Sequence, residues 1–193
     1  IYLQKMDVAE SQEAVYTSLY DYMTETVKEV PPGSGGVIFT PWLHGNRCPF
    51  EDPSASGMFF NIRLDTGKTE MINAVLEGTC FHLRWMLECQ DKKLKTSDTL
   101  RFVGGGALSP VTCQRLADIT GRKIEVVASP QNVGSVGLGL IPDLDVVSRF
   151  IPVAAVYVPD MDRHSAYEPY YRVFKNLYRS NRSNFRSLNN IHT

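Results

Sequence analysis

The chain has 193 residues, a length typical of one domain or at most two small ones. Its apolar fraction of 43% and charged fraction of 21% are near the globular averages, which excludes a disordered, collagenous or low-complexity chain. The net charge of -1 gives no overall attraction to nucleic acid or to an acidic membrane. The longest apolar run, residues 153–158, is far shorter than the ~20 residues that span a bilayer. We therefore expect neither nucleic acid nor a membrane as a partner.

The first half of the chain is predicted to hold two helices, with a short strand and a long loop between them. Residues 11–30 carry apolar side chains at steps of three and four, which is typical of one helical face. Residues 37–39 are a strand candidate, and residues 40–57 are predicted to be irregular because prolines and glycines interrupt them. Residues 69–89 are apolar on most faces, which predicts a buried helix in which Gly78 permits close packing against a neighbour.

The second half begins with a predicted strand-turn-helix-strand unit. Residues 99–103 form the first strand, three glycines form the turn, and residues 123–127 form the second strand. The helix between them covers residues 109–120, with Ser109 as its N-cap and Pro110 at its first helical position. The sheet of such a unit is most simply parallel.

A Gly-rich segment, a further strand and a long helix are predicted to complete the chain. The glycines are Gly134, Gly137 and Gly139, the strand covers residues 153–158, and the helix covers about residues 164–185. The predicted inner stripe of this helix consists of Tyr167, Tyr171, Phe174, Tyr178, Asn181, Phe185 and Leu188. A basic stripe on the same helix consists of Arg172, Lys175, Arg179, Arg182 and Arg186. We interpret it as a solvated face rather than a nucleic-acid-binding surface, because basic stems also cover apolar surface.

The four cysteines contain no Cys-x-x-Cys pair and are Cys48, Cys80, Cys89 and Cys113. We interpret them as reduced thiols of a cytoplasmic protein, because a chain of this size does not depend on disulfides. Two pairs of one histidine and one cysteine lie close in sequence, namely His44 with Cys48 and Cys80 with His82. Zinc ligands normally come as tighter pairs, so no metal site is predicted.

The glycines at 104–106 are the strongest chemical signal in the chain. Consecutive glycines let the backbone approach a ligand closely and adopt positive φ, and the following helix offers free N–H groups at its positive end. This combination predicts a cradle for phosphate, with a tight turn that holds no ligand as the alternative. A valine at position 106 would fill the space of the phosphate and resist a positive φ. No Gly-Lys-Ser/Thr follows, which excludes a P-loop.

A dinucleotide site of an oxidoreductase is a second interpretation of the same segment. Gly104 and Gly106 with Ser109 resemble the Gly-x-Gly-x-x-Gly pattern, and Glu125 lies near the distance expected for a ribose-binding acid. Two observations weaken this interpretation. First, Ser109 and Pro110 are typical of a helix start, whereas the dinucleotide pattern has its third glycine at this place to permit close helix packing. Second, Glu125 lies within its strand rather than at the carboxyl end of the strand.

Four motifs follow one another along the chain. They are the apolar strand and Gly-Asn-Arg-x-Pro loop of residues 36–49, the Ala-Val-Leu-Glu-Gly of residues 74–78, the Phe-Val-Gly-Gly-Gly-Ala-Leu-Ser of residues 102–109 with Gln114 and Asp118 after it, and the aromatic segment of residues 166–178. This order resembles the carboxy-terminal half of the FGGY carbohydrate kinases, which include the xylulose, ribulose, gluconate and glycerol kinases. Asn46, Asn61 and Asn73 depart from the family pattern, and we expect them to bear on substrate class rather than on fold.

The resemblance implies an α/β domain of the actin-like ATPase, ribonuclease-H-like type, with a mixed sheet flanked by helices. It implies that residues 1–193 are one domain, the ATP-binding half of a two-domain sugar kinase, truncated at its start because the chain begins with Ile1. The parent reaction would transfer the γ-phosphoryl group of ATP, with Mg²⁺, to a hydroxyl of a pentulose such as xylulose. The nucleotide-binding residues are then expected to be Gly104, Gly105, Gly106, Ala107, Ser109 and Pro110.

The resemblance also implies what this chain lacks. In the family, the catalytic aspartate and the sugar contacts belong to the amino-terminal domain, so no catalytic residue is expected here. The chain by itself is expected to be inactive, to bind ATP weakly and, because a domain face would be open, to self-associate, for example as a homodimer. A non-catalytic interaction module built on a degenerate kinase half is the remaining alternative.

Overall fold

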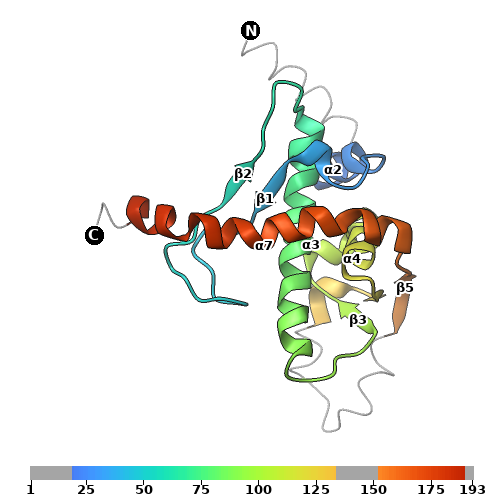
Figure 1. The fold of residues 1–193 in the computed structure, drawn as a ribbon. Helices are drawn as coiled ribbons and strands as arrows, with labels where there is room; N and C mark the ends of the chain where they lie inside the picture. Colours follow the sequence, from blue (N-terminus) through green and yellow to red (C-terminus); the bar gives the residue numbers. More distant parts are fainter. Residues whose placement is uncertain (1–18, 134–151, 190–193) are drawn as a thin grey trace.

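The computed structural model describes residues 19–133 and 152–189 (Figure 1). Residues 11–18 of the helix predicted over residues 11–30 lie outside these ranges, and so does the predicted Gly-rich segment. The helices are α2 (Leu19–Val27), α3 (Lys68–Asp91), α4 (Pro110–Thr120) and α7 (Met161–Asn189), with short 3-10 helices η1 (Ser34–Gly36), η2 (Gly105–Leu108) and η3 (Pro130–Asn132). The strands are β1 (Ile38–Thr40), β2 (Met58–Phe60), β3 (Thr99–Phe102), β4 (Lys123–Val127) and β5 (Val153–Tyr157).

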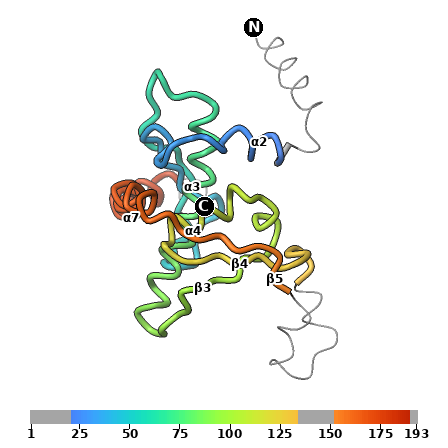
Figure 2. Tube along the Cα trace, turned by 90° about the vertical axis from the view of Figure 1, so that its right-hand side faces the viewer, coloured from blue at the N-terminus to red at the C-terminus, as the bar shows by residue number. Residues whose placement is uncertain are grey.

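A three-stranded mixed sheet supports the glycine turn. Strand β4 lies between β3 and β5 (Figure 2), parallel to β3 and antiparallel to β5. In this register Leu100 is opposite Ile124, and Ile124 is opposite Tyr157, and all three side chains belong to one apolar core. The parallel strand-turn-helix-strand unit and the mixed sheet are therefore confirmed.

Strands β1 and β2 form a separate antiparallel pair that packs on α3. The strand β2 was not predicted, because its three residues are too few to show an alternating pattern. Gly78 of α3 is buried against the backbone of β1, and a Cβ atom at this position would lie 2.1 Å from Phe39 O. The close packing predicted at this glycine is confirmed.

Gly78→Ala is expected to lower the free energy of unfolding by about 1–3 kcal/mol, the usual cost of overpacking, although alanine favours a helix more than glycine does. The reason is that the added methyl group must push β1 away from α3. Urea denaturation measures the change, with Thr79→Ala as the matched control because Thr79 is exposed on the next position of α3. Equal midpoints for the two variants would contradict this packing.

Helix α7 runs across α3 (Figure 1) and buries an aromatic stripe, as predicted. The buried aromatic residues of this stripe are Tyr167, Tyr171, Phe174 and Phe185. Trp42 packs against Phe174 and Phe185, with ring centroids 5.7 and 6.3 Å apart. The prediction is wrong for Leu188, which is 65% exposed, and it missed the buried Leu177.

Helix α7 begins at Met161, three residues before the predicted start. The carboxylate of Asp160 accepts hydrogen bonds from the backbone N–H groups of Asp162 at 2.9 Å and Arg163 at 3.1 Å. These bonds satisfy donors that a helix start leaves without an intrahelical partner. Asp160 therefore acts as the N-cap of α7, and the helix starts before the aromatic stripe from which its start was predicted.

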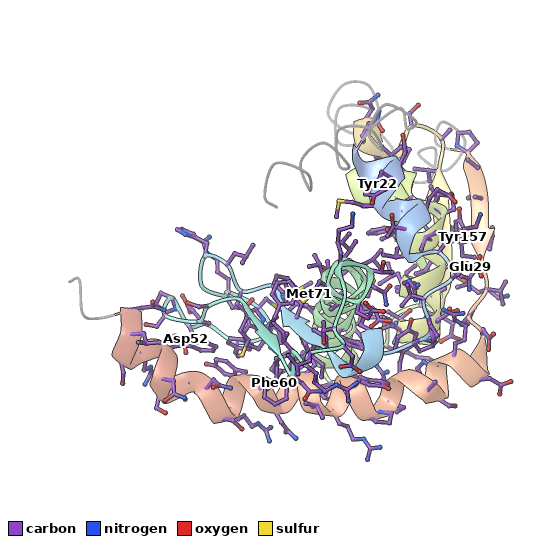
Figure 3. All side chains as sticks on the ribbon, turned by 90° about the horizontal axis from the view of Figure 1, so that it is seen from above. Tyr22, Glu29, Asp52, Phe60, Met71 and Tyr157 are labelled. Atoms are coloured by element: carbon purple, nitrogen blue, oxygen red, sulfur yellow. The ribbon has the colours of Figure 1, made fainter. Side chains whose placement is uncertain are left out.

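The long loop of residues 41–57 is held by polar contacts with itself and with α7. The amide nitrogen of Asn46 donates to Cys48 O at 3.0 Å and to Phe50 O at 2.8 Å, which a glutamate at this position could not do. Tyr178 OH donates to the buried carboxylate of Asp52 at 3.0 Å, and Figure 3 shows Asp52 beside the carboxy-terminal part of α7. Asn46 thus has a structural role within its loop.

The other two departures from the family pattern also have local structural reasons. Asn61 has a φ of 66°, a left-handed conformation that asparagine tolerates better than most residues. Asn73 is buried in α3, and its amide nitrogen donates to Ser34 Oγ at 2.8 Å. The expected bearing of these residues on substrate class stays a prediction.

Candidate functional site

The glycine turn, residues Gly104 to Gly106, connects β3 to α4 through the 3-10 helix η2. Gly104 has a φ of 92°, its N–H donates to Pro130 O at 2.9 Å, and its carbonyl accepts from Ala107 N at 3.1 Å. The sequence predicted a simple turn here. The observed 3-10 helix is a more ordered connection, because these two bonds fix Gly104, the residue that immediately precedes the 3-10 helix.

Space around the turn differs from one glycine to the next. Among the described residues, no heavy atom lies within 4 Å of a Cβ built at Gly104 or Gly105. A Cβ at Gly106 would lie 3.0 Å from Cζ of the Phe102 ring, and the φ of Gly106 is not positive. The expected need for positive φ at Gly106 is therefore wrong. Glycine is needed there for packing on Phe102, whereas the turn is open to a ligand at Gly104 and Gly105.

Three backbone N–H groups at the turn and at the start of α4, those of Gly105, Gly106 and Val111, have no hydrogen-bond partner within the ranges that the structure describes. The other donors at the start of α4 are used or missing. Ser109 Oγ accepts from Thr112 N at 3.2 Å, as predicted for an N-cap, and Pro110 has no N–H group. The start of α4 thus offers one free donor rather than the several expected, and the turn supplies the other two.

The remaining predicted site residues occupy different positions around the turn. Ala107 is 5% exposed and packs in the apolar core, where Cys113 Sγ contacts its carbonyl, so its methyl group supports the turn from behind. Leu108 is 60% exposed, and Val103 and Pro110 are exposed as well. We refer to Val103, Leu108 and Pro110, exposed apolar residues that flank the glycine turn in the sequence, as the apolar rim.

Comparison with known proteins gives the same assignment as the motifs. Residues 3–141 match the family described as "FGGY family of carbohydrate kinases, C-terminal domain". The chain belongs to the FGGY family of carbohydrate kinases. It is 30% identical over 182 residues to a gluconokinase of Bacillus licheniformis, with 89% of this chain and 35% of that protein covered. It is 31% identical over 171 residues to a xylulose kinase of Lactococcus lactis, with 83% of this chain and 34% of that protein covered.

The fold is that of FGGY kinases as well, which have the actin-like ATPase architecture. The crystal structure of a xylulose kinase from Rhodospirillum rubrum aligns with a TM-score of 0.75 and 25% identity, covering 95% of this chain and 38% of that one. The FGGY domain described here thus spans about a third of the length of the relatives it matches. The expected α/β class, with a mixed sheet flanked by helices, is confirmed.

Three polar residues singled out in the sequence analysis, Gln114, Asp118 and Glu125, are bonded to other residues of the FGGY domain. Gln114 donates to Asp118 Oδ1 at 2.7 Å and to Val158 O at 2.9 Å, so these two side chains hold the segment that leads into α7. Glu125 forms an ion pair with Arg101 at 3.3 Å on the neighbouring strand. A ribose-binding role for Glu125, which the dinucleotide interpretation requires, is therefore not favoured.

Sequence reasoning missed a buried polar cluster that joins α2, α3 and α4. Arg115 and Glu77 are both nearly inaccessible, with Arg115 NH1 3.7 Å from Glu77 Oε1. The Glu77 carboxylate accepts from Gly33 N at 3.1 Å and from Ser34 Oγ at 2.6 Å. Burial raises the pKa of Glu77, and these two donors and Arg115 act in the opposite direction.

The guanidinium of Arg115 also reaches α2 and α7. It donates to Val27 O at 2.6 Å, to Val30 O at 3.1 Å and to Tyr167 OH at 3.0 Å. No local pattern shows these contacts, because Arg115 is 88 positions from Val27 in the chain. The glutamate of the Ala-Val-Leu-Glu-Gly motif was the one available signal, since a charged residue is rarely buried without a partner.

The described residues show neither a metal cluster nor a membrane span. Within residues 19–133 and 152–189, no three His, Cys, Asp or Glu side chains are close enough together to hold a metal ion. No helix in the same ranges is both long and apolar enough to cross a bilayer.

Proposed function

We propose that residues 1–193 form the nucleotide-binding domain of an ATP-dependent sugar kinase, in which the glycine turn receives the phosphates of ATP. The supporting observation is the set of three free N–H groups, of Gly105, Gly106 and Val111, beside open space at Gly104 and Gly105. Phosphate oxygens accept hydrogen bonds from such groups, and the positive end of α4 adds a favourable field. The apolar rim offers a surface for adenine.

The reaction proposed for the whole protein is transfer of the γ-phosphoryl group of ATP to a hydroxyl of a pentulose such as xylulose. The matched relatives are named gluconokinase and xylulose kinase, which supports a small sugar or sugar acid as the acceptor. In such a transfer the protein mainly positions the reactants and stabilises charge. This domain would fix the nucleotide, and the sugar and the general base would be held by a part of the protein outside this chain.

The residues at the turn fit phosphate and do not fit Mg²⁺. Backbone N–H groups are hydrogen-bond donors, whereas Mg²⁺ requires oxygen ligands. Because no cluster of metal ligands exists among the described residues, we assign Mg²⁺ to the phosphates of the nucleotide and to groups outside those residues. No step is derived through the ion.

Two binding titrations separate this function from the dinucleotide interpretation. We expect the purified chain to bind ADP and ATP in the millimolar range, about -4 kcal/mol, because one helix end and a rim give few contacts. We expect no binding of NAD⁺ in the same range and no phosphorylation of xylulose or gluconate. Calorimetry and a coupled kinase assay make these measurements. Preference for NAD⁺, or turnover of a sugar by this chain alone, would contradict the proposal.

A further inference from the structure

Helix α2 contacts the start of α4 at the residue that caps it. Thr24 Oγ1 of α2 lies 3.2 Å from Ser109 Oγ. Ser109 Oγ also accepts from Thr112 N at 3.2 Å as the N-cap of α4. A hydroxyl group has one donor and two acceptor sites, so Thr24 can bond to Ser109 without displacing the cap.

Side-chain contacts on both sides of Thr24 fix the position of α2. Arg115 of α4 donates to the carbonyl of Val27, the last residue of α2, and to the carbonyl of Val30, three residues after the helix. Near the other end, Lys68 Nζ at the start of α3 donates to Tyr22 OH at 2.6 Å. Thr24 lies between these two anchors, so its hydroxyl is held at a defined place beside Ser109.

Ser109 links this contact to the proposed phosphate site. Its backbone N–H donates to Gly106 O at 3.4 Å, and the residue two positions later, Val111, carries the free N–H of α4. We propose that Thr24 is a positioning residue for nucleotide binding, which holds the Ser109 cap so that the donors of Gly106 and Val111 are ordered before the phosphate arrives. This inference rests on the proposed function. Ordering these groups in advance removes an entropic cost from binding.

Two substitutions at position 24 and one matched control test the proposal in the 193-residue chain. Thr24→Val keeps the shape and removes the hydroxyl, and it is expected to weaken ADP binding roughly three- to tenfold, the effect of one lost hydrogen bond. Thr24→Ser keeps the hydroxyl and is expected to restore the affinity. Thr26→Val removes a hydroxyl that donates to Tyr22 O within α2, and it is expected to leave the affinity unchanged. Binding is followed by NMR titration with ADP, and folding by urea denaturation.

The outcomes distinguish this inference from the function on which it rests. Equal ADP affinity for Thr24→Val and Thr26→Val, with ADP binding still weakened by Gly105→Val, would overturn the positioning role and leave the proposed function intact. If Thr24→Val lowers the ADP affinity and Thr24→Ser does not restore it, the threonine has a structural role and the positioning role is overturned. The same conclusion follows if Thr24→Val lowers the ADP affinity and also has a lower urea midpoint than Thr26→Val. Absence of any ADP-dependent shift in the unmodified chain would overturn both.

Discussion

Gly105→Val is expected to weaken ADP binding roughly tenfold or more while leaving the unfolding midpoint unchanged, because each hydrogen bond lost to a charged group costs about 1.5–3 kcal/mol. A Cβ at Gly105 meets no heavy atom within 4 Å among the described residues, and its φ is not positive, so the fold tolerates a side chain. The valine instead occupies the space in front of the free N–H groups, where a phosphate would approach. Calorimetry with ADP measures the loss.

Gly106→Val is the matched control for this prediction. Its side chain would meet the ring of Phe102, with the Cβ at 3.0 Å, so we expect a lower urea midpoint together with any loss of binding. The two glycines are adjacent, and the contrast between them separates a ligand contact from a packing contact. Unchanged ADP affinity in folded Gly105→Val would mean that the turn has no role in nucleotide binding.

Glu77→Leu and Arg115→Met are each expected to lower the free energy of unfolding by about 3–5 kcal/mol, because each leaves a buried charge without its partner. Both side chains are 2% exposed, so water cannot replace the missing group. Glu77 also accepts from Ser34 and Gly33, and Arg115 donates to the oxygens of Val27, Val30 and Tyr167. Urea denaturation of the two variants measures the loss.

A double variant and a surface pair provide the controls for the buried pair. Glu77→Leu combined with Arg115→Met is expected to cost less than the sum of the single changes, since no isolated charge remains. Glu25→Leu breaks an exposed ion pair with Lys28 in which both side chains are more than half accessible, and it is expected to cost at most about 1 kcal/mol. Equal losses for Glu77→Leu and Glu25→Leu would contradict the structural role given to this cluster.

Elements defined by local signals could be predicted from the sequence with accurate bounds. Helix α4 begins and ends as predicted, because Ser109, Pro110 and the glycine after Thr120 determine its ends through contacts within a few residues. Helix α3 is long and apolar, so its two ends moved by only one and two residues. Strand β4 has the predicted bounds as well.

Features that depend on contacts between distant segments could not be predicted. Nothing in the sequence shows that Gly106 packs on Phe102, or that the N–H groups of Gly105, Gly106 and Val111 stay free. The contact of Thr24 with Ser109 joins residues 85 positions apart, and the Glu77–Arg115 pair joins two helices. Such contacts follow from packing, whereas periodicity and capping report on single elements.

Residue-resolved NMR of the 193-residue chain with and without ADP tests the central claim most directly. We predict that the largest amide shift changes occur at Gly105, Gly106 and Val111, whose N–H groups are free, with small changes at Gly104 and Thr112, whose N–H groups are already bonded within the protein. Shift changes that leave residues 104–112 unaffected and gather elsewhere on the molecule would contradict the assignment of the glycine turn as the nucleotide site.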